Sequence, residues 1–339
     1  MRHFVIVGIL VVAMAALTYF GLNSVHLMPV EASAQAVPVD WMWNLQVIVM
    51  SFLFTLIVVP LIYSLIVFHR KKGDTTDAEH IEGNTRLEMI WTVIPLMAVL
   101  AFAYLGAYTL GQTRRVDPQA MEIKVWASQW VWNFEYPQYG ITSDKLYLPA
   151  NKQVLLKMES PDVIHSFWVP EFRIKQDVVP GRVTEYRITP TLIGSYAVRC
   201  AELCGVSHAY MEAPVVVVPQ PDFDAWVAQQ QAAASGRAAG GASSAENGQK
   251  LAQQYGCLAC HSANGTLIVG PTWQGLYGSQ VKLADGTTVT ADEAYLFESI
   301  TDPNAKIAAG FDPNVMPSFK DKLTEAQIND IIAYFAMLK

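Results

Sequence analysis

The densest chemistry in the chain is one short stretch that holds two thiols, an imidazole and a thioether, on Cys200, Cys204, His208 and Met211. Soft thiolate and thioether ligands combined with imidazole select copper over hard cations. A single blue-copper centre uses one cysteine, whereas two cysteines four positions apart let two thiolates bridge two copper ions. The spacing therefore predicts a binuclear copper site, in which each copper needs one more nitrogen ligand.

The second imidazole is predicted to be His165, by elimination among the 7 histidines of the chain. Two others lie near the N-terminus, two lie in a predicted cytoplasmic loop and one belongs to a different motif. Two other interpretations of the cysteine pair stay open. A structural zinc site is disfavoured because thioether is a poor zinc ligand, and a disulfide would leave His208 and Met211 without a role.

A second reactive motif, Cys257-Leu-Ala-Cys260-His261, has the pattern of c-type haem attachment, in which two thiols bind the haem vinyls and the histidine ligates iron. A thioredoxin-like Cys-x-x-Cys is the alternative, but its βαβ setting is absent. Only Met316 and Met337 follow the motif. Met337 belongs to a predicted C-terminal helix, whereas Met316 lies in an irregular segment that can approach iron from the opposite face. Met316 is therefore the predicted sixth ligand.

The composition indicates a membrane protein, since 52% of the 339 residues are hydrophobic and only 16% are charged. A net charge of -7 disfavours nucleic acid as a partner. The 4 cysteines are too few for a disulfide scaffold, which leaves them available for cofactors.

Residues 45–68 and 89–111 carry no charge. Each segment is long enough to cross about 30 Å of hydrocarbon as a helix. They predict a transmembrane helical hairpin over 43–111. The segment 1–34 is either a signal peptide or a third transmembrane helix. Its Ala32-Ser33-Ala34 resembles a cleavage site, but it lies well beyond the end of the apolar run.

The loop of the hairpin carries four basic residues: Arg70, Lys71, Lys72 and Arg86. The positive-inside rule places this loop in the cytoplasm and the rest of the chain outside. Arg114 and Arg115, beyond the other end of the hairpin, weaken this difference in positive charge. The haem-attachment motif gives the same orientation, because haem is attached to such motifs outside the cytoplasmic membrane.

Two soluble blocks follow the hairpin. Short alternating or β-branched runs over 116–220 predict an all-β domain, an antiparallel barrel or sandwich. An Ala/Gly/Ser-rich stretch over 234–248 predicts a flexible linker. The block 246–339 is predicted to be all-α, because apolar residues repeat at helix spacing behind a capping signature at Thr324.

The copper loop, together with His165-Ser-Phe-Trp-Val-Pro170, resembles subunit II of haem-copper oxygen reductases of the cytochrome c oxidase type. The resemblance covers about residues 40–220 and includes Leu87-Glu88-x-x-Trp91 and Gln129-Trp130-Val-Trp132. It implies a cupredoxin fold and a binuclear CuA centre. The implied ligands are His165, Cys200, the backbone carbonyl of Glu202, Cys204, His208 and Met211.

The resemblance also implies three further roles. The Glu202 carboxylate would bind magnesium or manganese at the boundary with the catalytic subunit, unless it is a solvated loop acid. Glu88 would lie at the cytoplasmic mouth of a proton channel, although an acid at a helix start also favours the helix dipole. Trp130 would be the site where electrons reach CuA. The alternative for Trp130 is an aromatic core strand with its neighbours Trp126, Trp132, Phe134 and Tyr136.

The last block resembles a class I cytochrome c, with Gly270-Pro271 where that family orients its histidine ligand. The whole chain is thus similar to subunit II of caa3-type oxidases. This implies a subunit in a bacterial-type cytoplasmic membrane, with both soluble domains on the outer side. It would take electrons from a c-type cytochrome or another external donor. It would pass them through haem c and CuA to subunit I, with subunit III as a further partner, coupled to proton translocation.

Two rival functions remain at this point. One is the electron-input subunit of a CuA-containing nitric oxide reductase, whose substrate is decided in a partner chain. The other is a stand-alone membrane-anchored electron carrier. The polar Glu88 at the head of an apolar hairpin argues against the carrier, because such a hairpin is suited to pack against other helices.

Overall fold

The computed structural model describes residues 1–77, 80, 82–239 and 244–338 and divides into two compact units, Met1–Arg115 and Val116–Lys339. The first unit contains three helices: α1 (Arg2–Ser24), α2 (Ala36–Val67) and α3 (Thr85–Thr113). All three are long and apolar enough to cross a membrane, which confirms the predicted helical hairpin and shows that the first apolar segment is also helical. At the start of α3, the Asn84 side chain caps the helix by accepting a hydrogen bond from the amide of Leu87.

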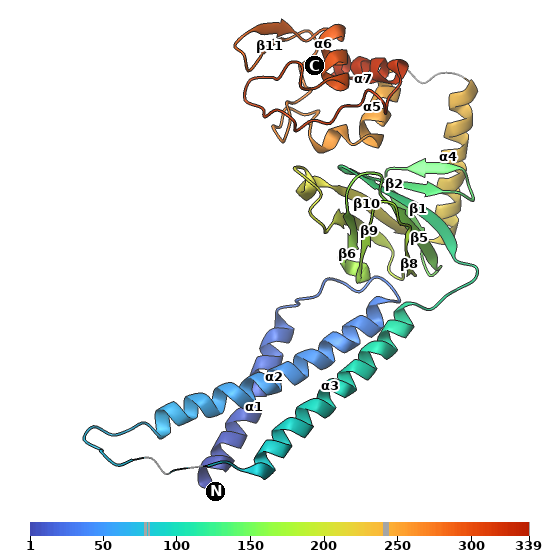
Figure 1. Cartoon of the computed structure of the whole chain (residues 1–339). Helices are drawn as coiled ribbons and strands as arrows, with labels where there is room; N and C mark the ends of the chain where they lie inside the picture. Colours follow the sequence, from blue (N-terminus) through green and yellow to red (C-terminus); the bar gives the residue numbers. More distant parts are fainter. Residues whose placement is uncertain (78–79, 81, 240–243, 339) are drawn as a thin grey trace. The chain divides into compact units, whose positions relative to one another are not determined.

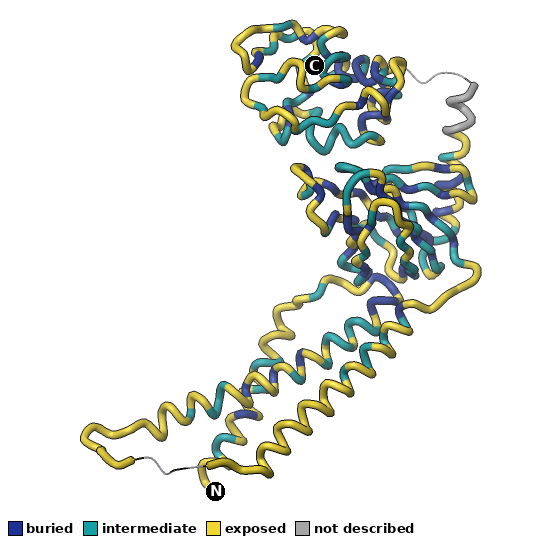
Figure 2. The backbone as a smooth tube through the Cα atoms, viewed as in Figure 1, coloured by how far each residue is buried: buried dark blue, intermediate teal, exposed yellow. Residues whose placement is uncertain are grey.

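The helices α1 and α2 pack along each other (Figure 1). The buried residues of α2 include Ser51 and Thr55, whose hydroxyls donate to backbone carbonyls of their own helix at 2.7 and 2.9 Å. Their polar groups are therefore satisfied inside the helix, and small side chains of this kind let a neighbouring helix approach closely. In contrast, α3 is exposed along nearly its whole length (Figure 2), so its apolar surface is available to lipid or to partner helices.

The second unit begins with a sandwich of two five-stranded sheets, which confirms the predicted cupredoxin-like β fold. The first sheet has the order β3-β2-β1-β5-β8, from Ile141–Ser143, Val131–Tyr136, Met121–Ser128, Val154–Glu159 and Thr184–Ile188. The second has the order β4-β10-β9-β6-β7, from Leu146–Pro149, Glu212–Val218, Gly194–Cys200, His165–Val169 and Ile174–Val178. The prediction of an antiparallel domain is wrong for two pairs: β1–β5 and β4–β10 are parallel, which is possible because each joins strands that are not consecutive in the sequence. The others are antiparallel. Alternate residues of β2 fill the core between the sheets, since Trp132, Phe134 and Tyr136 are fully buried.

The helix α4 (Gln220–Ala239) packs against the sandwich through an aromatic cluster. Trp226 stacks on Tyr147 with ring centroids 4.5 Å apart, and Phe223 is fully buried. The structure differs here from the flexible linker predicted over 234–248. Helix α4 continues to Ala239 and α5 starts at Ser244, and 240–243 lie outside the described residues. The reason is that alanine, which is abundant here, has the highest helix propensity.

The final block is helical, as predicted, with α5 (Ser244–Gln254), α6 (Glu293–Thr301) and α7 (Glu325–Met337). A small hairpin of β11 (Gln280–Lys282) and β12 (Thr288–Thr290) is added to it. The capping signature is confirmed, because the Thr324 and Gln327 side chains each bond the backbone of the other. Short 3-10 turns cover Pro170–Phe172 (η1), His208–Tyr210 (η2) and Cys257–Ala259 (η3).

Gly248 lets α5 cross α7, because a Cβ atom at this position would overlap the backbone carbonyl of Asp330. We expect Gly248→Ala to destabilise the last block by about 3 kcal/mol, since neither backbone can move aside without loss of core packing. Denaturant unfolding of the full chain, followed by haem absorbance, measures this effect. The exposed neighbour is the control: Gln249→Ala should change stability by less than about 0.5 kcal/mol. Equal stability of the two variants would contradict the prediction.

Candidate copper and haem centres

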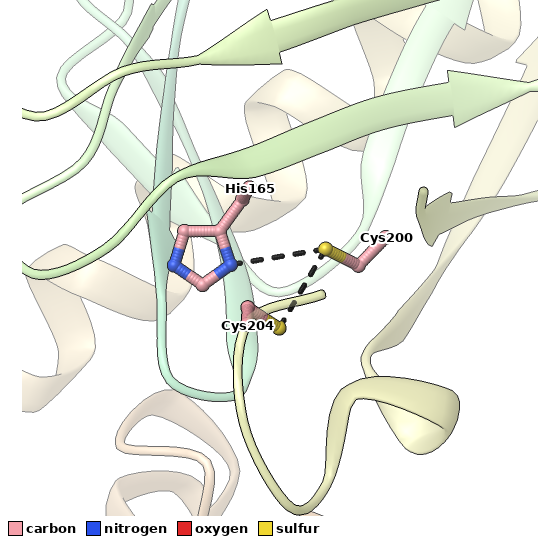
Figure 3. Close-up of side chains that lie close together, drawn as sticks. All are labelled: His165, Cys200 and Cys204. Carbon is pink, nitrogen blue, oxygen red and sulfur yellow. Dashed lines mark hydrogen bonds between the residues drawn. The ribbon is translucent and has the colours of Figure 1, made fainter. Parts of the chain in front are cut away.

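Strand pairing brings the first three predicted copper ligands together (Figure 3). His165 begins β6 and Cys200 ends β9, and these strands pair with Phe167 opposite Cys200. The Cys200 sulfur lies 3.8 Å from His165 Nδ1 and 3.7 Å from the Cys204 sulfur. All three side chains are buried, and their ligand atoms lie within 4.8 Å of one another.

The other three predicted ligands surround the same two sulfurs. His208 Nδ1 lies 3.5 Å from the Cys204 sulfur, and the Met211 sulfur lies 3.8 Å from it. The backbone oxygen of Glu202 lies 3.2 Å from the Cys200 sulfur. Two thiols, two imidazoles and a thioether thus converge in one place. This donor set is soft and fits copper.

Electrostatics in the site favour the ligating form of one thiol. The hydrogen bond with Cys204 outweighs burial and lowers the pKa of Cys200 to about 3. The same hydrogen bond raises the pKa of Cys204. Burial alone would lower the pKa of His165, but hydrogen bonds with Asp162 and Cys200 raise it to about 9. The Cys200 thiol is therefore readily deprotonated to the thiolate, which is the form that binds a metal.

Asp162 is a residue of the candidate copper site that the sequence patterns did not indicate. Its carboxylate accepts a hydrogen bond from His165 Nε2 at 2.9 Å and one from the backbone amide of Gln129 at 2.7 Å. Burial would raise the pKa of Asp162, but these hydrogen bonds hold it at about 2. Because the ionised carboxylate occupies Nε2, His165 Nδ1 is left to face the thiols. The only sequence signal is an acid three residues before the histidine.

We expect Asp162→Asn to weaken copper retention by about 10- to 100-fold, the usual cost when a partner of a metal-ligating histidine is replaced. The amide keeps the size of the side chain but loses the charge that orients His165. Competition of the purified protein with a copper chelator, followed by EPR, measures the effect. Asp222→Asn makes the same charge change on the exposed side of α4 and should retain copper like the wild type. Unchanged retention in Asp162→Asn would show that the carboxylate does not position the ligand.

Trp130 contacts the copper loop directly. Its indole Nε1 donates to the backbone oxygen of Cys204 at 3.1 Å, and the Gln129 side chain donates to the same oxygen at 2.7 Å. Gly205 permits this approach, since its φ is +121° and a Cβ there would lie 2.9 Å from the Trp130 ring. Trp130 therefore differs in its contacts from the aromatic residues predicted to cluster with it. Trp130 is bonded to the loop of the thiols, whereas its neighbours are either core or surface residues: Trp132, Phe134 and Tyr136 are buried, and Trp126 is partly exposed.

The haem-attachment motif lines a cavity of about 390 Å³, together with Met316 and with Trp130 of the sandwich. His261 Nδ1 donates to the backbone oxygen of Pro271 at 2.8 Å. This hydrogen bond leaves Nε2 free for iron. The His261 ring stacks on Trp273 with centroids 5.2 Å apart. A Cβ on Gly270 would lie 2.7 Å from the His261 ring, so only glycine fits beside the histidine.

Burial keeps the motif neutral before haem is attached. It raises the pKa of Cys257 to about 12 and also raises that of Cys260, and it lowers the pKa of His261. A neutral imidazole is the form that ligates iron. The apolar cavity, two thiols, one imidazole and one thioether therefore fit a covalent haem with histidine and methionine ligands.

Two predicted residues lie apart from these centres. The Glu202 side chain is exposed, and the described residues place no group of three or more metal-type side chains around it. Glu88 lies in the first turn of α3, where its amide bonds to the backbone oxygen of Asn84. Its side chain is exposed.

Comparison with protein families accounts for most of the chain. The family model for cytochrome c oxidase subunit II, transmembrane domain, matches residues 5–107, and the one for its periplasmic domain matches 141–219. The family model for cytochrome c matches 245–339.

Curated relatives give the same result over longer stretches. Cytochrome c oxidase subunit 2 of Alkalihalophilus pseudofirmus is 31% identical, and the match covers 88% of each chain. That of Bacillus sp. (strain PS3) is 31% identical, and the match covers 80% of each. The protein of the same name from Synechocystis sp. is 34% identical over 62% of this chain and 77% of the relative.

Proposed function

The chain belongs to the cytochrome c oxidase subunit 2 family, and on this basis we propose how its residues carry electrons through a respiratory terminal oxidase. The haem of the last block would take up electrons, the Trp130 region would lie on their way, and the copper pair of the β-sandwich would receive them. They would then leave for a partner subunit. The observation that supports this proposal most directly is the buried His165–Cys200–Cys204 cluster, which lies in the same unit as the haem cavity.

For the copper pair, the proposed ligands are the six that surround the two sulfurs: His165, Cys200, the Glu202 carbonyl, Cys204, His208 and Met211. When bound, the copper pair accepts and releases one electron at a time. The protein's contribution is to hold these side chains in place and keep water away. Asp162 orients one imidazole, and burial of the thiols excludes solvent.

For the haem, Cys257 and Cys260 would form the two thioether bonds, and His261 and Met316 would ligate iron. Histidine and methionine ligation raises the potential of a haem, which suits a donor to copper. The Pro271 carbonyl and Gly270 fix the histidine ring. The largely apolar cavity wall limits access of water.

The proposal extends to the partners. Subunit I would receive the electrons and reduce oxygen, with subunit III as a further neighbour and a c-type cytochrome or another external carrier as donor. The exposed apolar surface of α3 supports packing against partner helices, and Glu88 at its start would lie at the mouth of a proton channel. The exposed Glu202 carboxylate, in the copper loop, would bind magnesium or manganese together with ligands from subunit I.

The test is to purify the full chain from membranes with whatever binds it. We expect co-purification with a haem-copper subunit, two copper ions and one covalent haem per chain, and a mixed-valence dicopper EPR signal. The complex should consume oxygen when it is supplied with a reduced c-type cytochrome. A chain that purifies alone would contradict the oxidase assembly. Turnover of nitric oxide without oxygen consumption would favour the reductase instead.

A further inference from the structure

A serine joins the two redox loops of the second unit. The Ser207 hydroxyl lies 3.0 Å from the Cys260 sulfur. Ser207 is fully buried and directly precedes the proposed copper ligand His208, and Cys260 is a proposed haem-attachment thiol. We propose that Ser207 is the coupling residue through which an electron leaves the haem: from the Cys260 thioether, across the Ser207 hydroxyl, to His208. The inference rests on the proposed function of both centres.

The chemistry of this contact becomes directional once haem is attached. A thioether sulfur has no proton, so the Ser207 hydroxyl must donate the hydrogen bond to Cys260. One electron moves from the reduced haem to the oxidised copper pair, and no bond to a heavy atom forms or breaks. The hydroxyl connects Cys260 to the copper loop. A hydrogen bond joins it to the Cys260 sulfur, and covalent bonds join it to His208. Electronic coupling decays less steeply along bonds than through space.

The neighbouring contacts show that the two blocks meet closely at this place. The Asn133 side chain donates to the backbone oxygen of Gln254 at 3.2 Å. Gly256, which precedes the haem motif, has a φ of +72°, and a Cβ on it would lie 3.1 Å from the Cβ of Val131. A residue with a side chain at Gly256 would therefore press the haem motif away from β2.

Trp130 offers a second route, because it lines the haem cavity and bonds to the Cys204 carbonyl. That route continues from the backbone oxygen of Cys204 through the same residue to its sulfur. The serine route continues through one peptide into His208, whose Nδ1 lies 3.5 Å from the Cys204 sulfur. The two routes use different atoms, so substitutions can separate them.

The experiment uses the intact oxidase with Ser207→Ala, which removes the hydroxyl and adds no volume. A photoactivated ruthenium complex reduces the haem, and the reoxidation of the haem by CuA is followed by absorbance. We expect the rate of haem-to-CuA transfer to fall several-fold, while both midpoint potentials, the copper content and the EPR signal stay unchanged. Absence of copper or haem from the wild type would instead refute the proposed function, so the two failures are distinguishable.

Two glycine variants test the contact without touching the hydroxyl. Gly256→Ala should slow the transfer by separating the blocks. Gly275→Ala is the matched control, because its φ is +68° and the substitution causes a similar backbone strain, whereas a Cβ there would meet no atom within 4 Å beyond its chain neighbours. It should transfer at the wild-type rate. The inference is overturned if Ser207→Ala transfers electrons at the wild-type rate. It is also overturned if Trp130→Phe causes the entire decrease in the rate of haem-to-CuA transfer and Ser207→Ala contributes none of it.

Discussion

Cys204→Ser is expected to abolish the mixed-valence copper signal and nearly all oxidase turnover, while the haem spectrum stays normal. The Cys204 sulfur is the centre of the site, since it lies 3.7, 3.5 and 3.8 Å from Cys200, His208 and Met211 respectively. A serine oxygen is a hard donor and rarely loses its proton, so it does not bridge two soft copper ions. With one bridging thiolate left, the site holds at most one copper.

Copper analysis, EPR and oxygen consumption of the purified complex check this result. The haem is the internal control, because Cys257 and Cys260 belong to a different loop from the copper ligands and their thioether bonds do not depend on copper. A normal binuclear signal in Cys204→Ser would exclude Cys204 as a ligand. Loss of the haem spectrum as well would indicate a folding defect and contradict the expectation of an intact second centre.

The copper ligands could be predicted because most of them lie on one loop, where the residue types and their spacing indicate a copper site. His165 is remote in sequence, yet it followed from elimination among few histidines, and the pairing of β6 with β9 supplies the contact. Asp162 and Gln129 could not be assigned in the same way. Their roles depend on a turn that aims one carboxylate at both a ring nitrogen and a backbone amide.

The segment after the sandwich shows a different limit of sequence patterns. Alanine, glycine and serine over 234–248 predict a flexible linker, but the same alanines extend α4 to Ala239. Upstream, Trp226 holds the start of α4 on the sandwich by stacking on Tyr147. The Ser207–Cys260 contact was equally hidden, since it arises only when two blocks pack together.

Met316→Ala is expected to convert the haem from a low-spin to a high-spin or water-ligated form and to lower its potential. Met316 lines the haem cavity and packs against the core of its block, whereas the other downstream methionine, Met337, is 64% exposed. Removal of the thioether leaves iron with one protein ligand, and methionine is the ligand that raises the potential. An external donor of ordinary potential then reduces the haem poorly, so turnover with that donor falls.

Absorbance of the ferric protein, where methionine ligation gives a weak near-infrared band, and a redox titration of the haem measure the change. Met337→Ala is the matched control, because it makes the same substitution at an exposed position and should keep both the band and the potential. The CuA signal should be unaffected in both variants, since its proposed ligands come from the β-sandwich. If Met337→Ala removed the band, or Met316→Ala kept it, the sixth ligand would be a different residue. A drop in turnover would then have to arise at the copper site, where the EPR signal would reveal it.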